Sequence, residues 1–458
     1  MIALAVASFI QGPLLMNQQD QAAPRQFSSR RSFLKTSTMA TAGATALSAL
    51  SWARAANVAG SDIIRIGLIG CGARGPGAAL NAMNVDPGVR LVAMTDIIPD
   101  RVTGRRKLLK TRKPEQVQVD DSHCFSGLDG YKSVIESSDV VLIACSAKYH
   151  PAYLMEAIEA GKHVFVEKPH AIDPVGVRQV SAACELAKQK KLSIQSGLQS
   201  RYDAAFREAM KMIHDGAIGE IVSIEENFLR SPYQLYYRQK GQKEVEYQFS
   251  NQYHFAWLSG DDVTQSLVHN VDRATWAMKE QTPVKAHGLG GRSASFGEVY
   301  GDVFDHHSVI YEYANGTRLY AFCRTQNGCY NEYSSTYFGT KGRCYLMPGC
   351  RIEGSVKWKA PAKCPNPYDE EHRALFAAIR SGNPVNAGEY MARSTQVAVM
   401  GQLACYSGQE LTWEQLSKSN FTLLPKVEDV RMDMEPPVKP DAQGCYPVPM
   451  PGLTQFNI

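Results

Sequence analysis

The stretch from Gly260 to Trp276 carries side chains whose types and spacing suit acid–base chemistry. If it is helical, spacings of four, three and four place one stripe of side chains on the same face: Gln265, His269, Asp272 and Trp276. Polar side chains in an otherwise apolar run indicate a site rather than a surface. Histidine exchanges a proton readily near neutral pH, and a neighbouring carboxylate can orient its ring. The stripe therefore predicts His269 as an acid–base group and Asp272 as the partner that orients it.

A glycine-rich loop follows a short apolar run, residues 63–69, that has the length of a strand. The loop reads Gly70-Cys71-Gly72-Ala73-Arg74-Gly75, and a helix is predicted from Pro76 to Ala82. The first glycine permits a tight turn, the second lets the backbone approach a pyrophosphate, and the third lets the helix pack closely on the strand. The helix N-terminus supplies an anion site. The loop is therefore predicted to bind a dinucleotide.

A second apolar run, residues 89–95, ends at Asp96, which lies 26 residues after Gly70. A carboxylate at this place suits the 2′-hydroxyl of a ribose and repels a 2′-phosphate, so the sequence favours NAD over NADP. Arg74 or Arg101 would weaken that repulsion if its guanidinium lay beside the phosphate. Asp96 could instead cap a helix that is predicted over residues 97–110.

Strand-like and helix-like runs alternate in the first half of the chain. Strands are predicted at 140–144, 164–166 and 192–196, and helices at 151–160 and 174–190. This alternation predicts a doubly wound parallel sheet, an α/β Rossmann domain, in which ligands collect at the carboxyl ends of the strands. The residues at those ends should line one crevice: Gly70, Asp96, Cys145, Ser146, Glu167, Lys168, Pro169 and Gln199.

The sequence from Ala160 to Pro169, which ends in Glu-Lys-Pro, resembles the signature of the Gfo/Idh/MocA oxidoreductases, and the resemblance covers residues 62–415. It implies a Rossmann domain, then an α+β domain with a large open, mostly antiparallel sheet, and sugars, inositols or related polyols as substrates. It also implies that Lys168 lies beside the nicotinamide ring and the substrate. Chemistry favours a lysine there, because removing a hydroxyl proton while hydride leaves the same carbon requires a group that tolerates either protonation state.

Two positions depart from the family pattern. Many dehydrogenating members carry an aspartate four residues before the histidine, where this chain has Gln265, and an amide cannot accept a proton. Either Lys168 and His269 alone transfer the substrate hydroxyl proton, or the reaction differs from simple alcohol oxidation. Cys145-Ser146-Ala147 stands where members show a Thr-Pro-Asn-like sequence over the cofactor, although His150 matches the pattern.

The N-terminal residues 1–55 resemble a twin-arginine (Tat) export signal. Ser29-Arg30-Arg31-Ser32-Phe33-Leu34-Lys35 precedes a stretch rich in small residues, and Ala53-Arg54-Ala55 resembles a cleavage site. We therefore expect a periplasmic or otherwise exported protein with no stable membrane insertion after cleavage. Tat export moves folded proteins, which favours a cofactor that is loaded in the cytoplasm and then held tightly.

The remaining chain is predicted to comprise a Rossmann domain at 62–198, an α+β substrate and oligomerisation domain at 199–425, and a proline-rich arm at 426–458. The arm either wraps its own domain or reaches a neighbouring subunit of a homo-oligomer. A tyrosine-rich run, residues 233–253, is either a lid over a sugar or a surface insertion. Arg201 lies near the nicotinamide and substrate or simply caps the surface.

Charge and cysteine usage narrow the classes of partner. Residues 1–55 hold five basic and one acidic side chain, and the rest of the chain holds 44 of each, which argues against nucleic acid or an anionic membrane as a partner. The eleven cysteines show no CxxC pair and no matched Cys/His spacing, so no metal site is predicted. We expect mostly buried free thiols, with a bridge inside the 323–364 group as the alternative.

Together these features predict an exported NAD(P)-dependent oxidoreductase that acts on CH–OH groups of a sugar or polyol. One alternative is a redox-neutral, NAD-dependent enzyme of the glycosidase or epimerase type, which oxidises and then re-reduces a ring carbon. The stretch around His269 is more similar to the dehydrogenase-like branch than to those glycosidases. Another is an inactive dinucleotide- or sugar-binding protein, for which Gln265 is the best argument.

Overall fold

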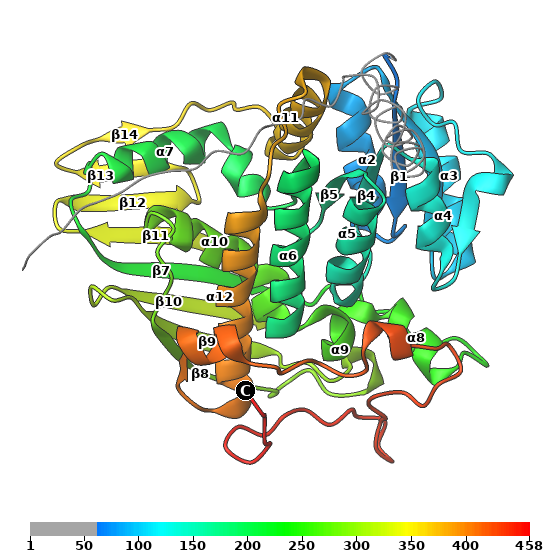
Figure 1. Ribbon diagram of the computed structural model, residues 1–458. Helices are drawn as coiled ribbons and strands as arrows, with labels where there is room; N and C mark the ends of the chain where they lie inside the picture. Colours follow the sequence, from blue (N-terminus) through cyan, green and yellow to red (C-terminus); the bar gives the residue numbers. More distant parts are fainter. Residues whose placement is uncertain (1–61) are drawn as a thin grey trace, which may run out of the picture. The chain divides into compact units, whose positions relative to one another are not determined.

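The computed structural model describes residues 62–458, and the predicted export signal lies outside them. The first layer is a six-stranded sheet in the order β3-β2-β1-β4-β5-β6, and every neighbouring pair is parallel (Figure 1). Its strands are β1 (Ile64–Ile69), β2 (Val89–Asp96), β3 (Cys124–Ser126), β4 (Val140–Ile143), β5 (His163–Val166) and β6 (Ile194–Ser196). The helices between them are α2 (Arg74–Val85), α3 (Pro99–Arg112), α4 (Gly130–Ser137), α5 (His150–Glu159) and α6 (Pro174–Lys190).

Both faces of this sheet are buried, as the sequence predicts for a doubly wound fold. Along β4, Val140 and Leu142 belong to one apolar core, whereas Val141 and Ile143 belong to the other. Successive strand residues point to opposite faces, so this alternation requires a helical layer on each side. The predicted doubly wound Rossmann architecture is confirmed.

One helix of the first core comes from far along the chain. The helix α11 (Pro367–Ser381) lies in the range assigned to the second domain, yet its Leu375 and Phe376 pack in the core that α2 and α3 cover. The core of the first sheet therefore includes a helix that follows β14 of the second sheet in the sequence.

The second sheet has nine strands in the order β14-β13-β12-β11-β7-β10-β9-β8-β15. Every pair is antiparallel except β7 with β10, so the predicted large and mostly antiparallel sheet is confirmed. The strands are β7 (Ile221–Arg230), β8 (Lys285–Gly291), β9 (His306–Glu312), β10 (Arg318–Thr325), β11 (Glu332–Gly339), β12 (Gly342–Met347), β13 (Arg351–Gly354), β14 (Trp358–Lys359) and β15 (Leu411–Thr412).

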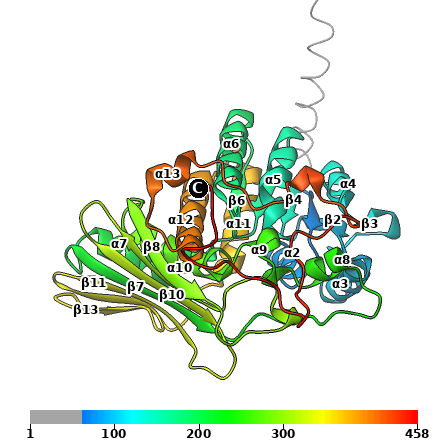
Figure 2. The same ribbon diagram turned by 90° about the horizontal axis from the view of Figure 1, so that it is seen from below.

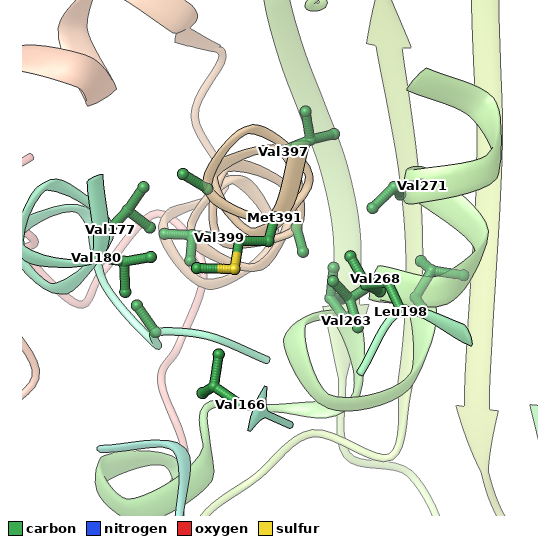
Figure 3. Packing of buried hydrophobic residues seen from close by; sticks show 14 of the residues in the cluster. Val166, Val177, Val180, Leu198, Val263, Val268, Val271, Met391, Val397 and Val399 are labelled. Carbon is green, nitrogen blue, oxygen red and sulfur yellow. The ribbon is translucent and has the colours of Figure 1, made fainter. Parts of the chain in front are cut away.

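Two helices, α10 (Val268–Ala277) and α12 (Gly388–Ser407), lie over one face of this sheet (Figure 2). The helix α12 is almost wholly buried because it packs between α6 of the first layer and α10 of the second. Figure 3 shows Val177 and Val180 of α6 on one side of α12 and Val268 and Val271 of α10 on the other. This shared apolar core connects the two layers.

The proline-rich arm packs on its own chain. The carbonyl oxygen of Val438 accepts a hydrogen bond from Gln248 Nε2 at 2.8 Å, and the Tyr446 hydroxyl donates to Glu244 at 2.5 Å. The arm therefore contacts the helix α8 (Glu244–Ser250), which lies inside the tyrosine-rich run. None of the helices in residues 62–458 is both long and apolar enough to cross a bilayer.

A buried ion pair joins α10 to the sheet beneath it. Arg273 lies 3.3 Å from Glu226 of β7, and neither side chain is exposed. Glu226 also accepts hydrogen bonds from Ser335, Tyr337 and Asn270 at 2.5, 2.9 and 2.8 Å. These contacts satisfy a carboxylate that would otherwise be costly to bury.

Replacing Arg273 with methionine should lower the free energy of unfolding by about 3–5 kcal/mol, because Glu226 would remain buried without its counter-charge. Chemical denaturation of the purified variant measures this loss. The matched control is Arg318→Met, which removes an exposed pair with Glu312 on the same sheet and should change stability little. Equal losses of unfolding free energy in the two variants would show that the buried pair contributes no more to stability than the exposed pair does.

Candidate functional site

The three glycines of the loop after β1 meet different steric demands. Gly70 has a φ of 98°, and a Cβ atom there would lie 2.6 Å from the backbone of Ala144. A Cβ atom on Gly75 would lie 1.9 Å from the carbonyl oxygen of Gly70. A Cβ atom on Gly72 would meet nothing within 4 Å, so open space lies above this part of the backbone. A tight turn, a close helix and an open backbone before α2 fit a pyrophosphate.

Asp96 lies at the carboxyl end of β2 and is held towards the loop. Its Oδ2 accepts from the backbone N–H of Cys71 at 2.7 Å, and its Oδ1 accepts from Ile98 at 2.9 Å. The alternative that Asp96 caps the following helix is wrong, because α3 begins at Pro99 and its N-cap is Ile98. Asp96 instead lines a pocket at the ends of β1, β2 and β4, where it suits a ribose hydroxyl.

This nucleotide pocket is lined by predicted and unpredicted residues. The predicted ones are Gly70, Gly72, Asp96, Cys145 and Ser146. Sequence reasoning missed Phe249 and Gln252, which come from α8 and the turn after it. Gln252 accepts a short hydrogen bond from Ser146, and Arg101 donates to the carbonyl oxygen of Ser250 at 3.0 Å. Part of the tyrosine-rich run therefore lines this pocket, which no spacing in the sequence indicates.

Arg74 turns away from Asp96. Its Nε donates to Glu167 at 2.6 Å, and its Nη2 lies 3.6 Å from Glu371 of α11. Arg74 therefore cannot serve as the neutralising group for a 2′-phosphate in this arrangement, whereas Arg101 lies 3.9 Å from Asp96. Glu371 is fully buried, and burial together with the charge of Glu167 raises its pKa well above the ordinary value. Arg74 thus ties the glycine loop to the Glu-Lys-Pro turn.

Two further predicted cofactor residues, His150 and Gln199, lie beside the strand ends. The ring nitrogens of His150 lie 2.7 Å from the carbonyl oxygen of Pro169 and 3.1 Å from that of Cys145. His150 therefore connects the chain after β4 with the chain after β5. Gln199 begins a short helical turn after β6, and its Oε1 is buried with no hydrogen-bond partner among the described residues.

Lys168 follows β5 and reaches across to the second layer. Its half-buried Nζ donates to the backbone carbonyl oxygen of Gln265 at 2.5 Å. Gln265 lies in a π-helical turn, Val263–Leu267, that leads directly into α10. Such turns occur frequently at functional sites. The acceptor lies four residues before His269 in the sequence, so Lys168 of the first layer contacts the turn that leads into the helix of His269 in the second layer.

His269 is buried and has no bound partner on Nδ1 among the described residues. Burial lowers the pKa of its imidazole well below 6.5, and the positive charges of Lys168 and Arg273 lower it further. The ring is therefore neutral near pH 7 and has a lone pair available for a proton.

The predicted pairing of Asp272 with His269 is wrong. Asp272 instead accepts from Arg201 at 2.8 Å and from Ser394 of α12 at 2.7 Å. Arg201 also donates to Glu280 and lies over the ring of Tyr390, and it is largely buried, so it does not cap the surface. One turn of helix separates Asp272 from His269, but the carboxylate points to a different neighbour.

The side chain of Gln265 also has a structural role. Its Nε2 donates to the carbonyl oxygen of Tyr253 at 2.9 Å and to Ser259 Oγ at 2.8 Å. Its Oε1 is buried without a partner among the described residues. The amide therefore anchors the tyrosine-rich run to the turn whose backbone holds Lys168.

All eleven cysteines lie within the described residues and are free thiols. Residues 62–458 contain no group of three or more histidine, cysteine, aspartate or glutamate side chains arranged to hold a metal ion.

Two family models match the chain. "Oxidoreductase family, NAD-binding Rossmann fold" matches residues 64–198, and "GFO/IDH/MocA C-terminal domain" matches residues 206–345. A glycosyl hydrolase family 109 protein from Bacteroides fragilis is 31% identical over 173 residues, which is 37% of this chain and 35% of that protein. This match therefore spans about a third of that relative's length. An inositol 2-dehydrogenase from Serratia proteamaculans is 26% identical over 258 residues, which is 56% of this chain and 66% of that protein.

Solved structures share the fold. The aldose-aldose oxidoreductase from Caulobacter crescentus, complexed with glycerol, superposes with a TM-score of 0.59 at 18% identity, covering 76% of this chain and 99% of that one. The myo-inositol 2-dehydrogenase from Lactobacillus plantarum gives a TM-score of 0.57 at 19% identity with the same coverage. At these identities the likeness concerns the arrangement of the elements.

Replacing Asp96 with alanine should weaken NAD binding about tenfold or more and NADP binding by less, because only NAD presents a 2′-hydroxyl to the carboxylate. Fluorescence titration of both cofactors measures the two changes. Asp100→Ala, an exposed change in the next helix, is the control. Equal losses for NAD and NADP would mean that Asp96 only supports the loop through Cys71.

Proposed function

Because this chain belongs to the Gfo/Idh/MocA oxidoreductase family, whose N-terminal domain is an NAD-binding Rossmann fold, we propose that it transfers a hydride between NAD and a carbon of a sugar or polyol. The proposal is supported by the hydrogen bond from Lys168 Nζ to the carbonyl oxygen of Gln265, in the turn that precedes the helix of His269, and by the effect of the Lys168 charge on the pKa of the His269 imidazole. Relatives named as an inositol dehydrogenase and an aldose oxidoreductase support the substrate class.

The two side chains have complementary tasks. When bound, NAD supplies the acceptor or donor of the hydride. Neutral His269 takes the hydroxyl proton as the carbon is oxidised and returns a proton in the reverse direction. Lys168, fixed by the Gln265 carbonyl, donates a hydrogen bond to the same substrate oxygen and stabilises the negative charge that develops there. Proton transfer therefore needs no carboxylate at position 265.

The tyrosine-rich run places aromatic rings near the turn that holds Lys168. Tyr233 and Tyr253 stack with centroids 4.6 Å apart, and the Tyr233 hydroxyl lies 3.0 Å from Ser266 Oγ, next to Gln265. The guanidinium of Arg230 lies over Tyr233 at 3.6 Å. Because Tyr253 and Arg230 already pack on the ring of Tyr233, we propose that this cluster borders the substrate through its ring edges and hydroxyl groups.

We further propose that the cofactor is retained during turnover and enters the exported compartment with the folded protein. The support is the set of contacts around α8, which lines the nucleotide pocket. The rings of Phe249 and Tyr149 stack with centroids 6.2 Å apart, and Val438 and Tyr446 of the arm form hydrogen bonds with α8. A retained cofactor would let an exported enzyme work where free dinucleotide is absent. The Tat-like pattern in residues 1–55 agrees with this proposal.

A second candidate is a redox-neutral cycle in which one bound NAD oxidises a ring carbon and later reduces it. The glycosyl hydrolase family 109 relative, which is 31% identical over 173 residues, favours it. The two candidates differ in one signal, because net oxidation accumulates reduced nicotinamide or passes its electrons to an acceptor, whereas a closed cycle leaves the cofactor unchanged.

Replacing Lys168 with alanine should lower kcat at least a thousandfold, or about 4 kcal/mol of transition-state stabilisation, and leave NAD binding nearly unchanged. A sugar and polyol panel followed by product analysis measures turnover in either candidate reaction. Lys110→Ala on the exposed face of α3 is the control. Unchanged turnover would remove Lys168 from the mechanism.

Replacing Tyr446 with phenylalanine removes the hydroxyl that fastens the arm to Glu244 and should speed NAD release roughly tenfold, since a hydrogen bond to a charged group contributes about 1.5–3 kcal/mol. Native mass spectrometry and stopped-flow release of the purified protein check this. Tyr237→Phe, an exposed change in the same run, should not affect release. If the wild-type protein purifies without nicotinamide, the retention proposal is wrong.

A further inference from the structure

A groove of about 370 Å³ lies between α6, α12 and α13 (Trp413–Lys418). None of its lining residues belongs to the nucleotide pocket, and neither Lys168 nor His269 lines it. The residues of α12 that line it recur along one side of the helix: Gly388, Glu389, Ala392, Arg393 and Gln396. Ser394, which binds Asp272, projects from a different side of α12. The groove is therefore separate from the NAD-dependent site, and its volume falls in the range of small-molecule pockets.

One polar side chain in the groove lacks a partner. Gln396 is only 5% exposed, and its Oε1 is buried without a hydrogen bond among the described residues. A buried amide oxygen without a partner is costly, so a ligand or solvent group that donates to it would be stabilised. Gln396 lines the groove, so its side-chain amide is a polar group that a ligand bound there would meet.

The walls around Gln396 are already fixed. Arg178 of α6 donates to the carbonyl oxygens of Ser417 and Ser419 at 3.2 and 2.6 Å, which joins α6 to the end of α13. Arg393 donates to Glu280 at 2.6 Å. The long side chains of the site are therefore ordered before a ligand binds, so binding would lose little side-chain conformational entropy.

The chemistry of the lining points to an uncharged, hydroxyl-rich ligand. Two cationic side chains, Arg178 and Arg393, and two carboxylates, Glu185 and Glu389, line the groove, and both carboxylates also pair with Lys188. A ligand with a net charge would face both signs, whereas hydroxyl groups can donate to carboxylates and accept from guanidinium groups. The half-buried ring of Trp413 offers an apolar surface of the kind that the C–H face of a sugar covers.

We propose that the groove between α6, α12 and α13 is a second carbohydrate-binding site, distinct from the site of hydride transfer. It would hold a monosaccharide or disaccharide through the Gln396 amide, the charged rim and Trp413. Binding there requires no chemistry, so the proposal stands or falls independently of the reaction proposed above.

The first test is to soak crystals of the full-length holoenzyme in glucose, galactose or maltose. At least one of these sugars should give electron density against Trp413 and within hydrogen-bond distance of Gln396, in addition to any at the catalytic site. The absence of sugar from the groove in all three soaks would overturn the proposal.

Calorimetric titration with the sugar that binds then tests the assignment of residues. Ser181→Trp places a large ring in the groove from an exposed position on α6 and should abolish groove binding, while kcat/KM stays within about twofold. Gln396→Leu, which keeps the volume of the side chain, should weaken binding about tenfold. Ala182→Trp, on the same helix but outside the groove, is the matched control.

Unchanged affinity in both Ser181→Trp and Gln396→Leu would overturn the proposal even if sugar is seen in the crystal, because the density would then reflect binding at crystal concentration only. If Ser181→Trp changes the oligomeric state and no sugar binds, the groove is a contact between subunits and the proposal is wrong.

Discussion

The hydrogen bond from Lys168 to the carbonyl oxygen of Gln265 is the contact on which the candidate site depends. It joins the end of β5 in the parallel sheet to the π-helical turn that precedes α10 under the second sheet. A backbone carbonyl is fixed by its helix, so it directs the ammonium without competing for a proton. This contact holds the lysine against the turn that precedes His269, whose burial keeps its imidazole neutral.

The surrounding structure holds both ends of that contact in place. On one side, Arg74 fixes Glu167, the residue before Lys168, and α11 returns from the far end of the chain to pack on α2. On the other, Ser394 of α12 and Arg201 hold Asp272, one turn of helix beyond His269. The helix α12 packs against both layers, so one shared apolar core fixes the two sheets relative to each other around the site.

The sequence predicts the parallel sheet, the glycine loop and the strand ends well, because each depends on short-range spacing and on the alternation of strands and helices. It also indicates Lys168 and His269 as candidate site residues, although the role of the lysine is implied by the family resemblance and not by its spacing. Partners that depend on side-chain direction were not predictable. Asp272 lies at the right helical spacing from His269 but points to Arg201, and Arg74 points to Glu167 rather than towards Asp96. The sequence pattern also does not predict contacts between residues that are far apart in the chain. Examples are Glu371 with Arg74 and Gln252 with Ser146.

The most direct test of the central claim is a crystal structure of the holoenzyme with a bound sugar or polyol that cannot react further. We expect one hydroxyl oxygen within about 3 Å of both Lys168 Nζ and a ring nitrogen of His269, with its carbon facing the nicotinamide ring. A productive complex in which that hydroxyl contacts neither side chain, or in which Lys168 has left the Gln265 carbonyl to face solvent, would contradict it.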